Sequence, residues 1–98
     1  MITLNDIFNN SHPHGLDGGK QTIIKNDKFI LSIVGGRSGL YGDFDEDFEL
    51  AIIDPITKDF ITRMVFPELN DDVMAYVNRE KLLEVANLLF KKYSFQES

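Results

Sequence analysis

The sequence predicts an α+β domain in which an antiparallel sheet of four to five strands, in meander order, carries a C-terminal helix on one face and a short N-terminal helix. Three observations predict this class. Stretches with alternating apolar residues recur between residues 21 and 66, as in strands with one buried face. Short turn sequences join these stretches, which favours antiparallel neighbours. The single long stretch with helical spacing follows last, at residues 79–93, so we expect a helix across one face of the sheet.

Size and composition favour one cytoplasmic domain spanning residues 1–98. The hydrophobic fraction of 43%, with eight Phe and three Tyr, is too high for a disordered chain. No apolar run approaches the roughly 18 residues of a membrane span, and the start MITLNDIFNN lacks the features of a secretory signal. Cysteine is absent, which excludes disulfides and thiolate zinc sites. We therefore expect a cytoplasmic protein with no membrane segment and no cofactor.

The first twenty residues are expected to contain one short helix and a loop. Thr3 can cap a helix over residues 4–9, with Asp6 in the favourable first turn. A helix of this length is unstable alone and must dock on the rest of the domain. Residues 9–20, NNSHPHGLDGGK, are rich in Asn, Gly and Pro, so we expect a loop there.

Four strands are expected between this loop and residue 66. The first two flank a tight turn at Asn26 and Asp27. The third places Phe48, Leu50 and Ile52 on one face. The fourth, FITRMVF, returns after the turn PITKD, and together these two are expected to form the clearest hairpin of the chain. The four expected strands are residues 21–25, 28–34, 48–54 and 60–66.

The C-terminal part is expected to hold the main helix. For residues 73–77, VMAYV, we favour a short fifth strand, with an extra helical turn as the alternative. Asn78 can cap a helix over residues 79–93, in which apolar residues recur at helical spacing and Lys91 and Lys92 stand near the C-terminus.

The stretch GGRSGLYGDFDEDFE, residues 35–49, combines closely spaced glycines with a run of acids. The glycines read G-x-x-G-x-x-G and precede a strand, whereas a dinucleotide site needs G-x-G-x-x-G before a helix. GLDGGKQT resembles a P-loop only superficially, because His14 stands at the position of the first glycine and a strand follows. We expect these glycines to supply positive φ angles or a bulge between two strands.

Negative charge is concentrated in the middle of the chain. Residues 38–77 contain ten acidic and two basic residues, a net charge of −8, within a chain whose net charge is −6. Such a segment repels the phosphate backbone of nucleic acids, so we expect no direct nucleic-acid binding. It attracts a basic protein surface or a metal ion instead.

The acidic loop also contains rings and an arginine, which are residue types that often anchor protein interfaces. We expect this loop to bind a protein partner with a basic surface, the carboxylates speeding the encounter. The alternative is that Tyr41 and Phe44 only close the edge of the sheet. The expected partner-binding residues are Arg37, Tyr41, Asp43, Phe44, Asp45, Glu46 and Asp47.

Two groups of residues resemble metal sites, and neither is expected to bind a metal. His12, His14 and Asp17 could supply three ligands, but no fourth ligand is identified. Asp43, Asp45 and Asp47 have the spacing of a calcium loop, yet Phe48 stands where that loop needs its glycine. No pair of carboxylates and no nucleophile with a nearby base indicates a catalytic site.

The stretch KFILSIVGGRSGLYGDFDEDFELAIID resembles the middle of small early proteins of tailed bacteriophages. The short, acidic, cysteine-free chain, rich in Asn, Asp, Ile and Lys, is similar in style. The resemblance covers residues 28–66 at most and carries over no functional residue. It implies a protein that acts in the host cytoplasm by binding a host protein and interfering with it.

These observations lead to one leading hypothesis and two competitors. The leading one is a non-enzymatic, acidic protein-binding module, an inhibitor or modulator whose carboxylates can imitate the phosphates of DNA in a basic cleft. The first competitor is a small-ligand or metal-binding protein, potentially an enzyme, in which the glycine-rich loop and the His12/His14 loop meet over one pocket. The second competitor is a homodimer formed through an exposed apolar strand face or helix.

Overall fold

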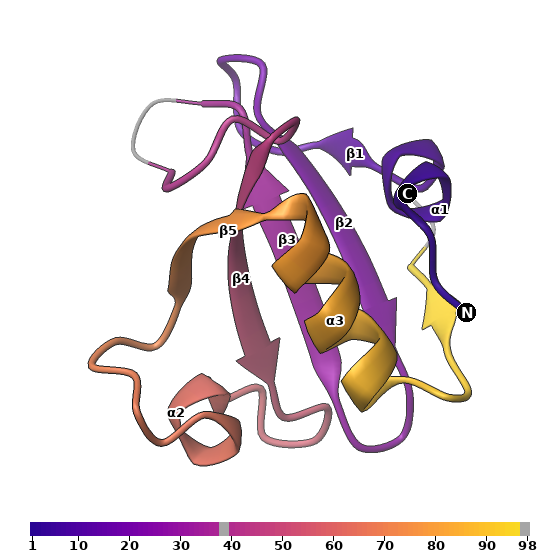
Figure 1. The fold of residues 1–98 in the computed structure, drawn as a ribbon, viewed down its shortest axis with the longest axis vertical. Helices are drawn as coiled ribbons and strands as arrows, with labels where there is room; N and C mark the ends of the chain where they lie inside the picture. The colour runs from indigo at the N-terminus through magenta and orange to yellow at the C-terminus, as the bar shows by residue number, and fades with distance from the viewer. Residues whose placement is uncertain (38–39, 97–98) are drawn as a thin grey trace.

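The computed structural model describes residues 1–37 and 40–96, and within them six strands form one antiparallel sheet with helix α3 across one face (Figure 1). The predicted α+β class is therefore confirmed. The elements are α1 (Leu4–Asn9), β1 (His12–Pro13), β2 (Lys20–Lys25), β3 (Ile30–Gly35), β4 (Asp47–Ile53), α2 (Thr62–Val65), β5 (Met74–Asn78), α3 (Arg79–Leu89) and β6 (Ser94–Phe95).

The sheet is a meander whose strands follow the order β1-β2-β3-β4-β5. Strand β6 joins it at β2, where Ile24 lies opposite Phe95. The outer edge of β2 is thus shared by β1 at one end and β6 at the other, and β5 forms the opposite edge of the sheet. Because every pair of neighbours is antiparallel, a short turn at residues 26–29 suffices to join β2 to β3, and a longer loop at residues 36–46 joins β3 to β4.

One face of the sheet, which we call the covered face, forms the core with the helices. Phe48, Leu50 and Ile52 alternate onto it and are fully buried, as the strand pattern predicts. Helix α3 packs Leu82 and Val85 against them, so its apolar stripe is confirmed as the contact surface. The free energy that stabilises the fold is concentrated here, since each large side chain removed from water contributes about 1.5–3 kcal/mol.

Helix α1 lies over the same face, and its predicted cap is confirmed. The Thr3 side chain accepts the N–H of Asp6, and the Asp6 carboxylate accepts the N–H of Thr3, a reciprocal capping box. Thr22 Oγ1 on β2 donates to the carbonyl of Ile7 at 2.7 Å. These contacts dock a helix that is too short to persist alone.

The chain start is fastened to α3 as well. The N–H of Ile2 donates to Asn87 Oδ1 at 2.8 Å, and Asn87 Nδ2 donates to the carbonyl of Ile2 at 3.1 Å. Near the other end, the N–H of Gln96 donates to the carbonyl of Ile23 in β2 at 3.0 Å. Residues near both ends of the described chain are therefore hydrogen-bonded to the rest of the fold, Ile2 to α3 and Gln96 to β2.

The predicted strand at residues 60–66 is wrong. Phe60 makes only an isolated bridge to Ile53, and the chain then turns into α2. Thr62 Oγ1 fixes this turn, because it accepts the N–H of Ile52 at 2.9 Å and donates to the carbonyl of Asp72 at 2.6 Å. The hairpin expected between residues 48–54 and 60–66 does not form, and β4 pairs with β5 instead.

Other boundaries differ less. The strand favoured at residues 73–77 is confirmed as β5, and Asn78 caps α3 by accepting the N–H of Lys81 at 2.8 Å. Helix α3 ends at Leu89 rather than Tyr93, because Phe90 has extended backbone angles and its ring is buried. Within the expected loop at residues 9–20, His12 and Pro13 form a two-residue strand. Among the described residues, none of the helices reaches the length and apolar character needed to cross a bilayer.

Candidate functional site

The loop between β3 and β4 brings together most of the residues expected to bind a partner. Backbone hydrogen bonds close it twice, from the N–H of Gly36 to the carbonyl of Gly42 at 3.0 Å and from the N–H of Phe44 to the carbonyl of Asp47 at 2.9 Å. Ser38 and Gly39 lie outside the described residues. The part from residue 40 to residue 47 is thus a folded extension of the sheet with a defined shape.

Two glycines of this loop are required by its backbone. Gly36 has a φ of +87°, so the expected positive φ is confirmed there. A Cβ atom at Gly42 would lie 2.7 Å from the carbonyl oxygen of Asp47, which is closer than side chains approach a backbone. The glycines therefore shape the loop itself, and the nucleotide-binding patterns excluded on sequence grounds are not needed to explain them.

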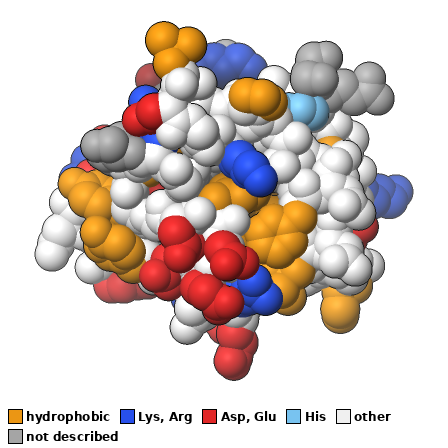
Figure 2. All heavy atoms as spheres, turned by 90° about the horizontal axis from the view of Figure 1, so that it is seen from above, with side chains coloured by type: hydrophobic (Ala, Val, Ile, Leu, Met, Phe, Trp, Pro, Cys, Tyr) orange, Lys and Arg blue, Asp and Glu red, His pale blue; other side chains and the backbone are white. Residues whose placement is uncertain are grey.

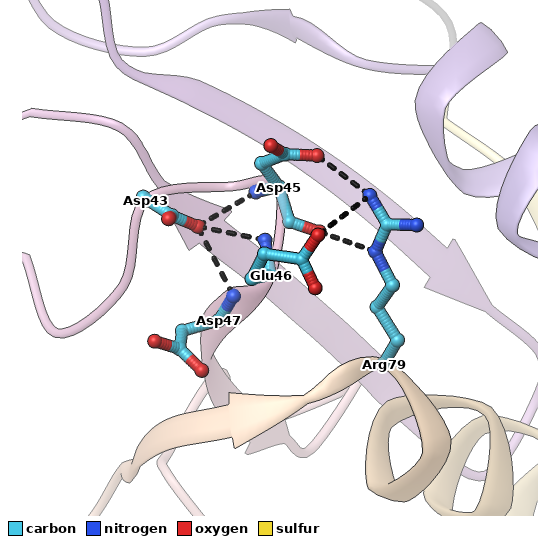
Figure 3. A network of polar contacts seen from close by, with 5 residues as sticks. All are labelled: Asp43, Asp45, Glu46, Asp47 and Arg79. Atoms are coloured by element: carbon cyan, nitrogen blue, oxygen red, sulfur yellow. Dashed lines mark hydrogen bonds and ion pairs between the residues drawn. The ribbon is translucent and has the colours of Figure 1, made fainter.

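Asp43 organises the acidic turn that follows. Its Oδ1 accepts the N–H groups of Asp45, Glu46 and Asp47 at 2.9, 2.9 and 3.0 Å (Figure 3). The N–H of Asp47, followed by those of Asp45 and Glu46, holds the pKa of the Asp43 carboxyl below its ordinary value because these bonds favour the ionised form. The Asp43 charge is therefore used within the molecule, to cap the turn.

Arg79, the first residue of α3, engages the next two acids. Its Nη2 lies 2.6 Å from Asp45 Oδ1 and 3.6 Å from Glu46 Oε1, and its Nε donates to the carbonyl of Asp45 at 2.7 Å (Figure 3). Its guanidinium also stands 5.8 Å from the centre of the Phe8 ring. In Figure 3 the Asp47 carboxylate points away from Arg79, so Asp47 keeps its charge for solvent or a partner.

Phe44 is not available to a partner, and the expectation of an exposed ring is wrong. The side chain is 6% exposed and meets the rings of Phe8 and Phe48 edge to face, with centroids 5.9 and 5.4 Å apart. The backbone explains the difference, since Phe44 has a φ of +59° that turns its side chain inward. Such an angle is uncommon for a bulky residue and does not follow from the sequence.

Tyr41 is exposed, and the fold gives it an aromatic neighbour. Tyr41 is 46% exposed and Tyr76 is 64% exposed, and their rings meet edge to face with centroids 5.8 Å apart. The N–H of Tyr76 donates to the carbonyl of Tyr41 at 3.0 Å, and the N–H of Tyr41 donates to Glu49 Oε1 at 3.3 Å. Sequence reasoning missed Tyr76, because only the irregular pairing of β4 with β5 brings these tyrosines together.

The Arg37 side chain packs on the other loop of this end of the molecule. Its side chain covers the turn at residues 15–19, where its Cδ would stand 2.7 Å from a Cβ placed on Gly19. It is half-buried, and within the described residues its Nε has no hydrogen-bond partner. Arg37 therefore packs the two loops together and does not present its charge beside the acidic turn.

Acidic side chains lie close together on the surface at this end of the molecule (Figure 2). Figure 2 looks onto the end of the molecule where the loops lie and shows a compact group of acidic side chains beside a basic one, with hydrophobic side chains on both sides. Asp47 lies opposite Asn78 in the sheet, two residues from Tyr76, so the acids and the tyrosine pair are neighbours on this surface. We call Tyr41, Tyr76, Asp45, Glu46 and Asp47 the acidic–aromatic surface.

The metal sites considered from sequence are not assembled. His12 Nε2 lies 2.8 Å from the carbonyl of Gln96, and His14 lines a hollow on the sheet. Across residues 1–37 and 40–96, no three His, Asp or Glu side chains are grouped so that they could hold a metal ion. Neither His12 with His14 and Asp17 nor the aspartates of the acidic turn forms such a group.

The glycine-rich loop and the loop at residues 9–20 do meet, as the ligand-binding alternative requires. Between them lies an open hollow of about 440 Å³, lined by Ser11, Gly18 and Lys20 on one side and by Gly36, Asp43 and Asp45 on the other. Neither histidine lines it. The hollow offers the ammonium group of Lys20 and the carboxylates of Asp43 and Asp45. Both carboxylates already bind groups of the protein, Asp43 a backbone N–H and Asp45 the Arg79 side chain.

Comparison of the chain with protein-family models, with curated proteins and with solved structures gives no match in any of the three. No family assignment follows, and the geometry of the loop region is the basis for a functional interpretation.

Proposed function

We propose that the protein is a non-enzymatic protein-binding module that uses the acidic–aromatic surface to bind a basic surface on another protein. The observation that carries the proposal is the exposed tyrosine pair held by a backbone hydrogen bond beside the fixed acidic turn. Tyrosine is the residue type most suited to such a role, because it offers a large, rigid contact area and a polar tip.

The stiffness of the surface supports this function. Binding normally requires ordering of loops and side chains, and this ordering weakens affinity. Here Asp43 fixes the turn through three backbone hydrogen bonds, and Arg79 fixes the side chains of Asp45 and Glu46. The surface is therefore shaped before a partner arrives.

The distribution of charge supports a basic partner. Within residues 1–37 and 40–96 Asp47 makes no ion pair, and it lies beside Asp43, Asp45 and Glu46 in the acidic turn (Figure 3). Carboxylates at the rim of an interface accelerate the encounter with a basic surface and fix its orientation. We infer that association weakens as salt is added, because exposed charges are screened beyond about 8–10 Å at physiological ionic strength.

Within this proposal the protein acts as an inhibitor or modulator. The carboxylates would occupy a basic cleft that otherwise receives the phosphates of DNA, and the tyrosine rings would add apolar contact. The resemblance to small early phage proteins supports a host protein as the target. No residue is assigned a catalytic role.

Capture of a partner from cell lysate tests the proposal when matched variants are compared. Tyr41→Ala with Tyr76→Asn removes both rings, and Asn is chosen because it tolerates the φ of +52° at residue 76. Glu46→Lys with Asp47→Lys reverses charge without touching the Asp43 cap. We expect each pair to reduce capture at least tenfold, corresponding to about 1.4 kcal/mol or more.

The control is Asp17→Lys with Asp59→Lys, which makes the same change of net charge at exposed acids of other turns. The control should capture the partner nearly as well as the wild-type protein. Capture that is unchanged in both test pairs, or lost equally in the control, would remove the acidic–aromatic surface from consideration.

A second candidate function, binding of a small ligand, is favoured by one observation, the hollow of about 440 Å³ where the two loops meet. Thermal melts with Ca²⁺, Zn²⁺, Mn²⁺ and a panel of nucleotides test it. A ligand present at 100 times its Kd stabilises a protein by about 2.7 kcal/mol, which raises the Tm of a domain of this size by roughly ten degrees or more. A panel without any shift would argue against this candidate.

A further inference from the structure

The face of the sheet opposite to the covered face, which we call the open face, has a regular layout. Pairing of β2, β3 and β4 arranges nine of its side chains in three rows of three, with Ser32 at the centre. All three helices contact the core cluster on the covered face. The rows are Gln21, Val34 and Glu49; Ile23, Ser32 and Ala51; and Lys25, Ile30 and Ile53.

This open face is largely apolar. Five of the nine side chains are aliphatic, and Leu40, Phe60 and Val73 stand around a shallow hollow of about 240 Å³ over the central strands. Phe60 is 53% exposed. Strands that are apolar on both faces are typical of sheets that are covered on both sides, so the open face has the composition of a surface that is buried in use.

The two charged residues of the open face have opposite signs and stand at opposite corners. Lys25 ends β2 at one corner, and Glu49 of β4 stands diagonally across at the other. The face is therefore neutral, within a chain whose net charge is −6. Two copies can bring these faces together without net repulsion, because their excess negative charge lies elsewhere.

We propose that the open face binds a second copy of this chain in a symmetric dimer. A twofold axis that lies in the interface beside Ser32, perpendicular to the line from Lys25 to Glu49, places Lys25 of each copy over Glu49 of the other. With strands about 4.8 Å apart and two residues spanning about 6.8 Å, this axis makes the strands of the two sheets cross at roughly 70°. That angle is near the orthogonal class of sheet packing.

The small side chains at the centre allow the two sheets to approach. Ser32 and Ala51 stand where the axis passes; they are 8% and 7% exposed in the single chain and line the hollow, so the contact between copies falls on the larger side chains around them. The interface is small, because Ser32, Val34 and Ala51 are already buried within the single chain, and it therefore buries less than the about 800 Å² per partner of a standard interface. We therefore expect a weak, reversible dimer that forms at micromolar concentrations or above.

Charge reversal at the two corners provides the test, by sedimentation equilibrium across a range of protein concentrations. Lys25→Glu and Glu49→Lys each replace two attractive contacts by two repulsive ones, and each should weaken self-association at least about tenfold. Mixing the two variants should restore association as a heterodimer, because each Lys then faces a Glu again. Restoration also shows that both variants are folded.

The matched controls are Lys92→Glu and Glu68→Lys, which reverse exposed charges outside the open face and should dimerise like the wild-type protein. If Glu49→Lys fails to fold, Ala51→Arg at the centre replaces it and should abolish the dimer. A wild-type protein that stays monomeric at millimolar concentration would overturn the proposal, even if it then bound an apolar dye or another protein. Persistence of the dimer in both corner variants, or failure of the mixture to associate, would overturn it as well.

This inference does not rest on the proposed function. Glu49 Oε1 accepts the N–H of Tyr41, so capture of a partner is compared with Lys25→Glu and Ala51→Arg, which leave the residues of the acidic–aromatic surface and their hydrogen bonds unchanged. Capture of a partner can fail while the dimer forms, and the dimer can fail while capture persists. The two experiments therefore separate the two surfaces.

Discussion

The turn that begins at Asp43 and the turn that begins at Asp54 are built alike. In each, the aspartate Oδ1 accepts backbone N–H groups two and three residues further on, at 2.9 and 2.9 Å after Asp43 and at 2.8 and 2.9 Å after Asp54. In each, these bonds lower the pKa of the aspartate. This arrangement is a common way for a short side chain to stabilise a turn.

The surroundings of the two turns differ. The residue after Asp43 is Phe44, which is buried, and Arg79 ties the turn to α3. Two residues after Asp54 comes Ile56, which is 87% exposed. The comparison shows that a run of acids can have an internal purpose, and that only those carboxylates not engaged within the turn are available to a partner.

The largest expected difference between the turns concerns their apolar side chains. Phe44→Ala removes a ring packed against two others in the core and should lower the free energy of unfolding by about 3 kcal/mol. Ile56→Ala removes a side chain that faces water and should change it by no more than about 0.5 kcal/mol. Urea denaturation measures both values, and equal effects would contradict the distinction between an anchored and a peripheral turn.

A smaller difference is expected for the backbone. Gly42→Ala places a methyl group 2.7 Å from the Asp47 carbonyl oxygen, so we expect a loss of about 2 kcal/mol. Lys58 closes the other turn with a φ of +64°, and Lys58→Gly relieves that strain while adding freedom to the unfolded chain, for a net gain of about 0.5 kcal/mol. Thermal melts should therefore move in opposite directions for the two variants.

The smallest effect is a dependence on pH that the two turns should share. Both aspartates have an ordinary pKa of 3.8 that is lowered in the folded protein, for Asp43 mainly by the N–H of Asp47 and for Asp54 mainly by that of Thr57. A lowered pKa stabilises the fold above the ordinary value, and this contribution disappears as the pH falls through the folded-state pKa.

Asp43→Asn and Asp54→Asn should each be less stable than the wild-type protein near pH 7 and should lose less stability between about pH 5 and pH 2. Urea denaturation at a series of pH values measures this. A variant whose pH dependence matches that of the wild-type protein would show that its aspartate does not act as an ionised cap.

Local signals in the sequence predict the elements whose structure is set locally. Thr3 and Asn78 accept backbone N–H groups within three residues, and both helix starts are found where these residues predict them. The alternation of Phe48, Leu50 and Ile52 is likewise confirmed as the covered face of β4. The fold class follows from such elements taken together.

Residues 60–66 could not be assigned in this way because two periods are present in them. Phe60, Thr62, Met64 and Phe66 alternate as in a strand, while Ile61 and Val65 are spaced as in a helix. Contacts with distant residues decide between the two. Thr62 binds the backbone of both Ile52 and Asp72, and this bonding favours a turn of helix.

The sequence predicted only part of the candidate site, because the rest of it also depends on contacts between distant residues. The acids were predicted because they lie close together in the sequence, and Asp43, Asp45, Glu46 and Asp47 do lie together in one turn (Figure 3). The internal use of Asp43, the burial of Phe44 and the pairing of Tyr41 with Tyr76 depend on backbone angles and on the bulge in the pairing of β4 with β5. These features are set by tertiary structure, and a single sequence carries no direct signal for them.

The hydrogen bonds between Ile2 and Asn87, and between Gln96 and Ile23, have a consequence for biosynthesis. The helix that covers the sheet and the strand that completes its edge leave the ribosome after all the strands of the meander. Until then the covered face of the nascent meander is exposed to solvent, and such intermediates are prone to aggregate or to recruit chaperones. We expect a chain that stops before α3 to be degraded rather than to accumulate as a smaller folded product.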